Sequence, residues 1–193
     1  MMINSESIQA AASRIKGKIN RTPLTFDSKL NIYIKWENQQ ETGAFKIRGA
    51  LNKILALAPW EQERGLVAVS AGNHGLGVAY AATLVGAKAT VFIPEKNKEE
   101  SILHNGAVVH KIAGDYSQAE IEAQNYAFKR GATWVSPYND PQVIAGQGTA
   151  ALELLAEFPQ LDFILTPVGG GGLLSGTALA AKYVSPRIKI FGT

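Results

Sequence analysis

Hydrophobic and polar positions follow two rhythms along most of this chain. From residue 65 onward, short runs rich in β-branched residues precede longer segments whose apolar positions recur every three or four residues. The first rhythm is typical of buried strands and the second of helices with one apolar face. Strands are expected at 65–70, 88–94, 107–113, 132–137, 162–168 and 187–192. Helices are expected at 75–86, 96–106, 115–131, 148–158 and 172–184.

The helix expected at 115–131 has the clearest amphipathic pattern. Its apolar positions include Ile121, Tyr126 and Phe128, and Lys129 and Arg130 stand at its C-terminal end. Cations are favourable at that end of a helix because they face the negative end of its dipole.

Alternation of strands and helices with short connections predicts an α/β fold, a doubly wound parallel sheet covered on both faces. In such sheets ligands bind at the carboxyl ends of strands, where the strand order reverses. Candidate functional residues are therefore expected in the loops that leave the strands. A break into two lobes is plausible near residues 139–147, although composition does not mark it.

Composition and charge exclude several classes of function. The net charge of +3 comes without a Lys/Arg block, which argues against a nucleic-acid partner. There is no cysteine for disulfides or thiolate metal sites, and His74, His104 and His110 show no metal-ligand spacing, so no metal is expected. No apolar run approaches the roughly 20 residues of a membrane span. Residues 1–20 lack the apolar core of a signal peptide, so we expect a cytoplasmic protein without a membrane partner.

The strongest local signal is TPVGGGGLLSG at 166–176, where four glycines follow a strand and open a helix. A backbone without Cβ atoms can fold closely around an anion and direct several N–H groups at it. The sequence matches neither the dinucleotide fingerprint nor the Walker A pattern. A tight turn would need only one or two glycines, so phosphate binding is the favoured interpretation.

A second strand-loop-helix junction, VSAGNHGLG at 69–77, carries polar side chains. Its free N–H groups could hold a carboxylate, and Asn73 could donate a hydrogen bond to a phenolate or carbonyl oxygen. Taken alone, the segment is explained at least as well by a helix N-cap at Asn73 and a hydrogen-bonded His74.

Lys46 is the third candidate. In TGAFKIRGA, at 42–50, it follows Phe45 where a Gly/Thr loop becomes a helix. A lysine at a helix N-terminus faces the positive end of the dipole, which lowers its pKa and favours the neutral amine that Schiff-base chemistry requires. Most lysines are simply solvated at the surface. A lysine, an asparagine loop and a phosphate loop together, however, suit a carbonyl cofactor that bears a phosphate, and pyridoxal 5'-phosphate is that cofactor.

These segments resemble the fold-type II pyridoxal-phosphate enzymes of the threonine dehydratase and serine racemase group. KWENQQETGAFKIRGALNKI is similar to the family's lysine segment, and SAGNHGLGVAYAA to its substrate and cofactor loop. VIAGQGTAALELL and PVGGGGLLSG resemble its later motifs in the same order. The resemblance spans nearly all of the chain. It implies a fold like that of the tryptophan synthase β-subunit, with a small lobe at 45–145 and an incomplete large cofactor lobe at 1–44 and 146–193.

The resemblance also implies roles for single residues. Lys46 would form the Schiff base with the cofactor and later move the Cα proton, while Phe45 would pack near the cofactor ring and Asn73 would bind its 3-oxygen. The phosphate would be wrapped by Gly169, Gly170, Gly171, Gly172 and Leu173. The substrate carboxylate would be surrounded by Ser70, Ala71, Gly72, Asn73 and His74.

Two departures concern single positions. Ala44 replaces the serine that usually precedes Phe-Lys in the family, a change of one hydroxyl. Ala71 stands where serine racemases have the serine that donates a proton on the opposite face. Because racemisation needs acid-base groups on both faces, the resemblance implies elimination: L-threonine or L-serine would become a 2-keto acid and ammonia, as in amino-acid metabolism and isoleucine biosynthesis.

A further departure is length. Family chains continue well past RIKIFG, adding the rest of the large-lobe sheet and the residue that contacts the pyridine nitrogen, whereas this sequence ends at Thr193. We therefore expect a homo-oligomer whose dehydratase activity is weak or absent compared with that of a complete relative. The alternative is a non-catalytic cofactor-binding or interaction remnant. A generic nucleotide-binding domain is disfavoured, since no acidic ribose-binding residue accompanies the glycines.

Overall fold

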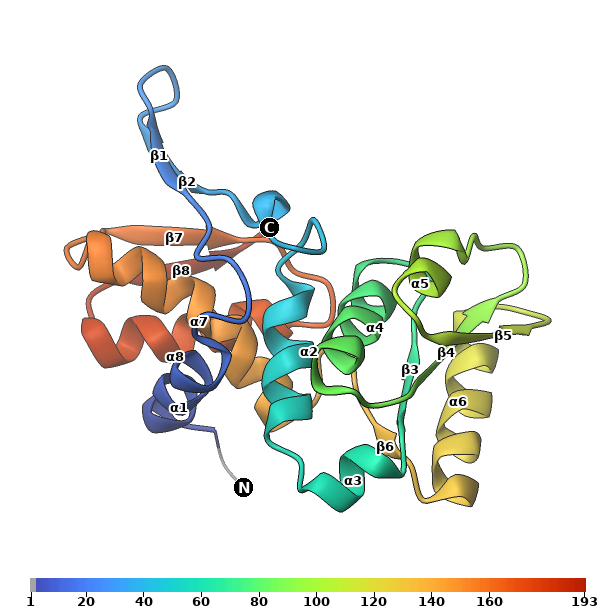
Figure 1. Ribbon diagram of the computed structural model, residues 1–193. Helices are drawn as coiled ribbons and strands as arrows, with labels where there is room; N and C mark the ends of the chain where they lie inside the picture. The colour runs from blue at the N-terminus through green and yellow to red at the C-terminus, as the bar shows by residue number, and fades with distance from the viewer. Residues whose placement is uncertain (1–2) are drawn as a thin grey trace.

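The computed structural model describes residues 3–193, in which strands and helices alternate from residue 66 onward as the sequence pattern predicts (Figure 1). The helices are α1 Ser5–Ile15, α2 Lys46–Leu55, α3 Pro59–Glu63, α4 Asn73–Val85, α5 Glu100–His104, α6 Tyr116–Arg130, α7 Pro141–Glu157 and α8 Gly172–Val184, with a 3₁₀ turn, η1, at Glu37–Gln39. The strands are β1 Leu24–Asp27, β2 Ile32–Lys35, β3 Leu66–Val69, β4 Ala89–Pro94, β5 Val108–Ile112, β6 Thr133–Trp134, β7 Phe163–Thr166 and β8 Lys189–Gly192.

The larger sheet is parallel, with strand order β5-β4-β3-β6. Alternate residues of β3 point to opposite faces, so Val67 and Val69 pack with α6, while Ala68 belongs to the core shared with α2 and α4. Figure 1 shows α4 and α6 on either side of β3. The expected doubly covered parallel sheet is confirmed.

The strand order of this sheet reverses at β3. From β3 the chain moves outward through β4 to β5, and then returns to place β6 on the other side of β3. The carboxyl ends of β3 and β6 are therefore adjacent, and a crevice for a ligand is expected between the loops that follow them, at residues 70–72 and 135–137.

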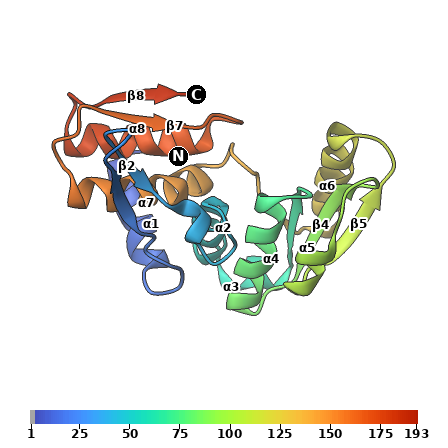
Figure 2. The same cartoon turned by 90° about the horizontal axis from the view of Figure 1, so that it is seen from above.

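The remaining elements form a second layered unit around α7 (Figure 2). Helices α1, α7 and α8 enclose a core that includes Ile8, Leu155 and Ala180, and the parallel pair β7-β8 covers it from one side. The antiparallel hairpin β1-β2 extends away from this unit. No helix among residues 3–193 has the length and apolar character required to cross a bilayer.

Helix α7 starts earlier than the pattern predicted. It begins at Pro141 instead of residue 148, because Asp140 caps it by accepting hydrogen bonds from the backbone N–H of Gln142 at 2.7 Å and of Val143 at 3.1 Å. One continuous helix thus runs through the segment in which a lobe break was considered plausible. The division into lobes at 45–145 and at 1–44 with 146–193 stays a prediction.

Helix α6 has the expected bounds within one residue, but the prediction of its apolar face was wrong at two positions. Phe128 is 89% exposed and Ile121 53% exposed, whereas Ala119, Ala123 and Ala127 are buried against the sheet. The small alanine side chains let α6 lie close to the strands, with the Tyr126 ring packed on Phe92 beside them. Large side chains on the flanks of that narrow strip remain in solvent.

Candidate active site

Lys46 is the first residue of α2, as the sequence predicts. Its Nζ donates a hydrogen bond to the carbonyl oxygen of Pro137 at 2.7 Å and lies 5.4 Å from the centre of the Phe45 ring. Burial lowers the pKa of Lys46, because removing water penalises the charged ammonium. The amine is therefore more readily neutral than that of a solvated lysine, and it stands at the carboxyl end of β6.

The loop after β3 turns sharply into α4. Gly72 is the N-cap, its N–H donates to the Ser70 hydroxyl at 3.1 Å, and Asn73 is the first helical residue. A Cβ at Gly75 would clash with the Ser70 carbonyl oxygen, so glycine is required there for the close turn. The N–H groups of the first turn have no acceptor within the helix and can bind a carboxylate. Asn73, and not Gly72, was the N-cap considered from the sequence, and the structure corrects this.

His74 points into the protein and is only 3% exposed. Its Nε2 lies 2.9 Å from the carbonyl oxygen of Val135, which can only accept, so Nε2 carries the proton and Nδ1 does not. Nδ1 has no hydrogen-bond partner among the described residues. Burial, and then the nearby charge of Lys46, lower the pKa of His74 to about 4, so the imidazole is neutral at pH 7.

The glycine run lies between β7 and α8. Gly171 is the N-cap of α8 with φ of 83°, a left-handed conformation that strains other residues, and Gly172 is the first helical residue. No heavy atom lies within 4 Å of a Cβ built at Gly169 or Gly171, whereas the Tyr138 ring covers Gly170. Open space, a helix N-terminus and unpaired first-turn N–H groups fit a phosphate.

Glycines also set the distances between the helices that carry these groups. A Cβ at Gly77 of α4 would lie 3.2 Å from the backbone N of Ile47, next to Lys46. A Cβ at Gly146 of α7 would lie 2.6 Å from Cα of Gly49 in α2, and one at Gly148 would lie 2.8 Å from the carbonyl oxygen of Gly176 in α8. Backbone contacts thus connect α4 to α2, α2 to α7 and α7 to α8. They join the helix after the asparagine loop to the helix after the glycine loop.

A buried charged cluster fixes the start of α2 from the other side. Arg48 is fully buried and binds Glu37 at 2.7 Å and Glu153 at 2.7 Å, and Lys35 binds Glu153 at 2.6 Å. Burial alone would raise the pKa of Glu153, but hydrogen bonds and charge from Arg48 and then Lys35 outweigh it and lower that pKa. The cluster joins β2, η1, α2 and α7, with Thr149 as a further partner of Arg48 at 3.2 Å.

A cavity of about 540 Å³ adjoins the candidate site between the hairpin, α7 and β7. Its lining includes Phe45 and Leu173, both assigned to the cofactor by the resemblance, together with Tyr33 and Leu154. It connects the residue before the lysine with the first turn of α8.

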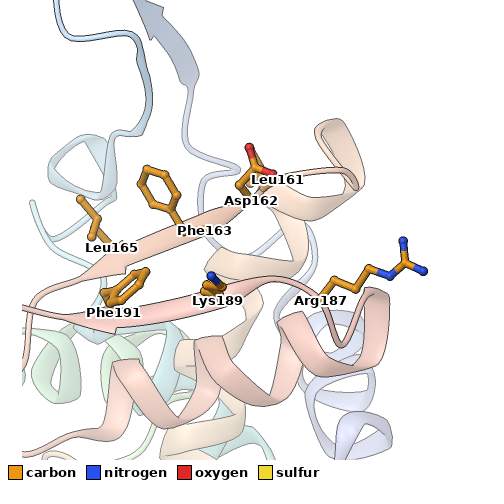
Figure 3. Close-up of a pocket in the computed structure, with 7 residues that line it drawn as sticks. All are labelled: Leu161, Asp162, Phe163, Leu165, Arg187, Lys189 and Phe191. Atoms are coloured by element: carbon orange, nitrogen blue, oxygen red, sulfur yellow. The ribbon is translucent and has the colours of Figure 1, made fainter.

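The outer face of the β7-β8 sheet is apolar and open. Phe163, Leu165 and Phe191 are each about half exposed, at 50%, 56% and 49%, and they line a hollow of about 480 Å³. Figure 3 shows these side chains, with Lys189, standing on the face of the sheet opposite the helices. Phe163 and Leu165 also line the cavity of about 540 Å³ that contains Phe45 and Leu173.

Three residues after β6 contact the candidate site. Pro137 accepts a hydrogen bond from Lys46, and Val135 accepts one from His74. Tyr138 packs on the glycine loop. These three residues were not among the candidates chosen from the sequence. The strand expected at 132–137 could have indicated them, because residues at the carboxyl end of a strand beside the reversal point are candidate ligand contacts. Arg48 was also missed, although it stands among apolar helix positions two residues after Lys46.

The fold and the site together define a doubly wound α/β protein with a half-buried lysine at the start of α2 and glycine-containing loops at the N-termini of α4 and α8. The family model described as "Pyridoxal-phosphate dependent enzyme" matches residues 15–193, and the chain belongs to this family. The cofactor of the family is pyridoxal phosphate.

Individual relatives agree with this assignment. The chain is 43% identical over 200 residues to the L-threonine ammonia-lyase of Thermotoga maritima, a match that covers 99% of this chain and 50% of that protein. Among solved structures, maize serine racemase superposes with a TM-score of 0.95 at 36% identity, covering 100% of this chain and 61% of the other. The processed form of threonine deaminase isoform 2 from Solanum lycopersicum superposes with a TM-score of 0.92 at 30% identity. That match covers 97% of this chain and 54% of the other. The chain therefore spans about half to three fifths of the length of these relatives.

Proposed function

We propose that this chain holds pyridoxal phosphate on Lys46 and takes part in the dehydrative deamination of L-threonine or L-serine to a 2-keto acid and ammonia. The observation that carries the proposal is the position of the Lys46 amine. It is held 2.7 Å from the Pro137 carbonyl oxygen at the point of strand-order reversal, with the N-terminus of α8 on the other side of Tyr138. A lysine of lowered pKa beside a phosphate-binding helix end suits a phosphorylated aldehyde.

When bound, the cofactor supplies an electron sink that stabilises negative charge at the substrate Cα. The chain's own residues hold it. The backbone N–H groups of 169–173 would bind its phosphate, Phe45 would pack beside its ring, and Asn73, exposed at the start of α4, would donate to its 3-oxygen. The unpaired first-turn N–H groups of α4 orient the substrate carboxylate.

Proton transfer is assigned to Lys46. With a substrate in the site, the readily neutral Nζ of Lys46 would accept the Cα proton on the face from which it projects. Ala71 presents no proton donor to the opposite face, so the chain favours elimination over racemisation. His74, neutral and bound to Val135, adds no competing charge beside the amine.

The substrate and setting belong to the same proposal. Relatives named for threonine ammonia-lyase and threonine dehydratase support a hydroxyl-bearing amino acid as substrate. Because other relatives are named catabolic threonine dehydratases, a role in isoleucine biosynthesis is one option within amino-acid metabolism. We place the reaction in the cytoplasm, without nucleic-acid or membrane partners. The open apolar face of β7-β8 supports a homo-oligomer.

The second candidate is a cofactor-binding or interaction remnant without catalysis. The chain covers 50% of the length of the Thermotoga maritima relative. Such a remnant would bind the cofactor on Lys46 yet release no keto acid.

Borohydride reduction of the cofactor-loaded chain, followed by peptide mapping, tests the cofactor assignment. The adduct should lie on Lys46 and not on Lys35 or Lys53, whose ammonium groups are held in ion pairs with Glu153 at 2.6 Å and Asp140 at 2.9 Å. Attachment at either control lysine would refute the assignment. Keto-acid release from threonine and serine then separates the dehydratase from the remnant.

A further inference from the structure

We infer that residues 135–138, directly after β6, form a strap that positions Lys46 relative to the glycine loop, with His74 and Tyr138 as the positioning residues at its two ends. The inference deepens the proposed function and rests on it. No sequence motif marks this segment, and the strap is defined by three contacts with residues far away in the chain.

The first end of the strap is fixed by His74. Its Nε2–H donates to the Val135 carbonyl at 2.9 Å inside the core, where both residues are buried. A buried carbonyl without a donor is unfavourable, so this hydrogen bond holds the direction of the segment. Helix α4, which carries His74, is thereby linked to the end of β6.

The middle of the strap holds the amine. Only Ser136 separates Val135 from Pro137, whose ring restricts φ to about −65°. The His74 hydrogen bond fixes the Val135 carbonyl and the proline ring fixes φ of residue 137, so the segment that leads to the Pro137 carbonyl has fewer free torsions. Lys46 Nζ donates to that carbonyl at 2.7 Å, and the lysine side chain is therefore held in one direction.

The second end of the strap lies on the glycine loop. The Tyr138 ring covers Gly170 so closely that any Cβ there would overlap it, and a Cβ at Gly172 would lie 3.0 Å from the Tyr138 carbonyl oxygen. Tyr138 is thus packed on the N-terminus of α8.

These contacts give the strap a role during the reaction. When Lys46 is joined to a carbonyl compound, its Nζ no longer donates to Pro137 as a free amine does. His74 and Tyr138 keep the segment in place meanwhile, so that the same carbonyl receives Nζ when the amine is released. A strap fixed at one end only would let the Pro137 carbonyl, and with it Nζ, turn away from the glycine loop.

The test compares His74→Gln with His74→Met in the full chain. Glutamine places an N–H near the position of Nε2, and methionine has a similar shape without a donor. Pyridoxal phosphate is titrated into each variant by visible absorption, and adducts are mapped after borohydride reduction. We expect His74→Met to weaken cofactor binding about tenfold and to spread adducts to other lysines, with His74→Gln restoring affinity and attachment at Lys46.

A second pair keeps the test informative if His74→Met does not fold. Tyr138→Phe keeps the ring on Gly170, and Tyr138→Ala removes it from a half-exposed position. Weaker binding in Tyr138→Ala alone supports the strap. Equal affinity and equal attachment at Lys46 within both pairs would overturn it while leaving the proposed function intact. Failure of the unmodified chain to form the Lys46 adduct would overturn both.

Discussion

Gly146 of α7 lies directly against Gly49 of α2: a Cβ at Gly146 would stand 2.6 Å from Gly49 Cα and would also overlap the carbonyl oxygen of Arg48. This contact sets how near α7 comes to the helix that begins with Lys46. Through Gly148 and Gly176 the same helix α7 touches α8, which begins at the glycine loop. The separation of the lysine and the phosphate loop therefore depends on backbone contacts that no side chain interrupts.

Gly146→Ala tests that dependence. Alanine is the better helix former by about 1 kcal/mol, so propensity alone would stabilise α7. Overpacking against α2 should reverse the sign and destabilise the chain by about 1–3 kcal/mol, measured by urea unfolding. Gly169→Ala, whose Cβ would enter open space, should change stability by less than about 0.5 kcal/mol. A Gly146→Ala chain as stable as the control would show that the helices can separate freely.

The glycine loop can be probed most cleanly at Gly169. Asp at Gly170 would displace Tyr138, and Asp at Gly171 would be strained at φ of 83°, so either change alters more than charge. Gly169→Asp should weaken pyridoxal phosphate binding by about tenfold or more, because a carboxylate repels the phosphate within the N–H cradle. Gly169→Asn has the same shape without the charge and should weaken it less. Equal losses in fluorescence titrations would mean that phosphate does not bind there.

His74 makes stability depend on pH. Its pKa is about 4 in the folded chain and near 6.5 when unfolded, so between these values the unfolded state binds more protons. Stability from this group is complete above pH 6.5 and is lost as pH falls through that window, by about 2 kcal/mol between pH 7 and pH 5. Urea unfolding at both pH values measures it.

The control for this pH effect is His74→Gln, which cannot titrate. The difference in unfolding free energy between pH 7 and pH 5 should be smaller in this variant by about the same 2 kcal/mol. Because the two chains share every other titratable group, only His74 accounts for the difference. An unchanged pH dependence would place the imidazole in contact with water and not in the core.

Self-association should depend on the outer face of β7-β8. Leu165→Asp places a charge on the same face as Phe163 and Phe191. It should convert an oligomer to a monomer in light scattering. Phe128→Asp is the matched control, since Phe128 is more exposed, at 89%, but lies on α6, remote from that face. A Leu165→Asp chain that keeps the mass of the unmodified protein would remove the face as an interface.

Most elements of the sheet could be predicted from the sequence, but their lengths could not. The strand expected at 132–137 contains only Thr133 and Trp134, and the helix expected at 96–106 is reduced to α5. A local sequence pattern indicates which residues prefer to be buried. The length of a strand depends instead on how many of its residues hydrogen-bond with the adjacent strand. β6 pairs with β3 for two residues and then bends toward Lys46.

The candidate site was predictable where local chemistry suffices and not elsewhere. Lys46 at the start of α2 and the glycines at the start of α8 follow from short motifs, because loop glycines and helix termini have their properties within a few residues. The partners of those groups are separated from them along the chain. Pro137 is 91 residues from Lys46, and Val135 is 61 residues from His74.

The sequence by itself determined the family, the order of strands and helices, and the residues suited to a phosphorylated carbonyl cofactor, since each depends on contiguous residues. Tertiary structure alone decided that β6 returns beside β3, and hence that the carbonyls of Pro137 and Val135, directly after it, face Lys46 and His74. It also decided that alanines, and not Phe128, form the buried face of α6. Burial and hydrogen bonding depend on which distant segments approach and how closely, and a one-dimensional pattern does not contain those distances.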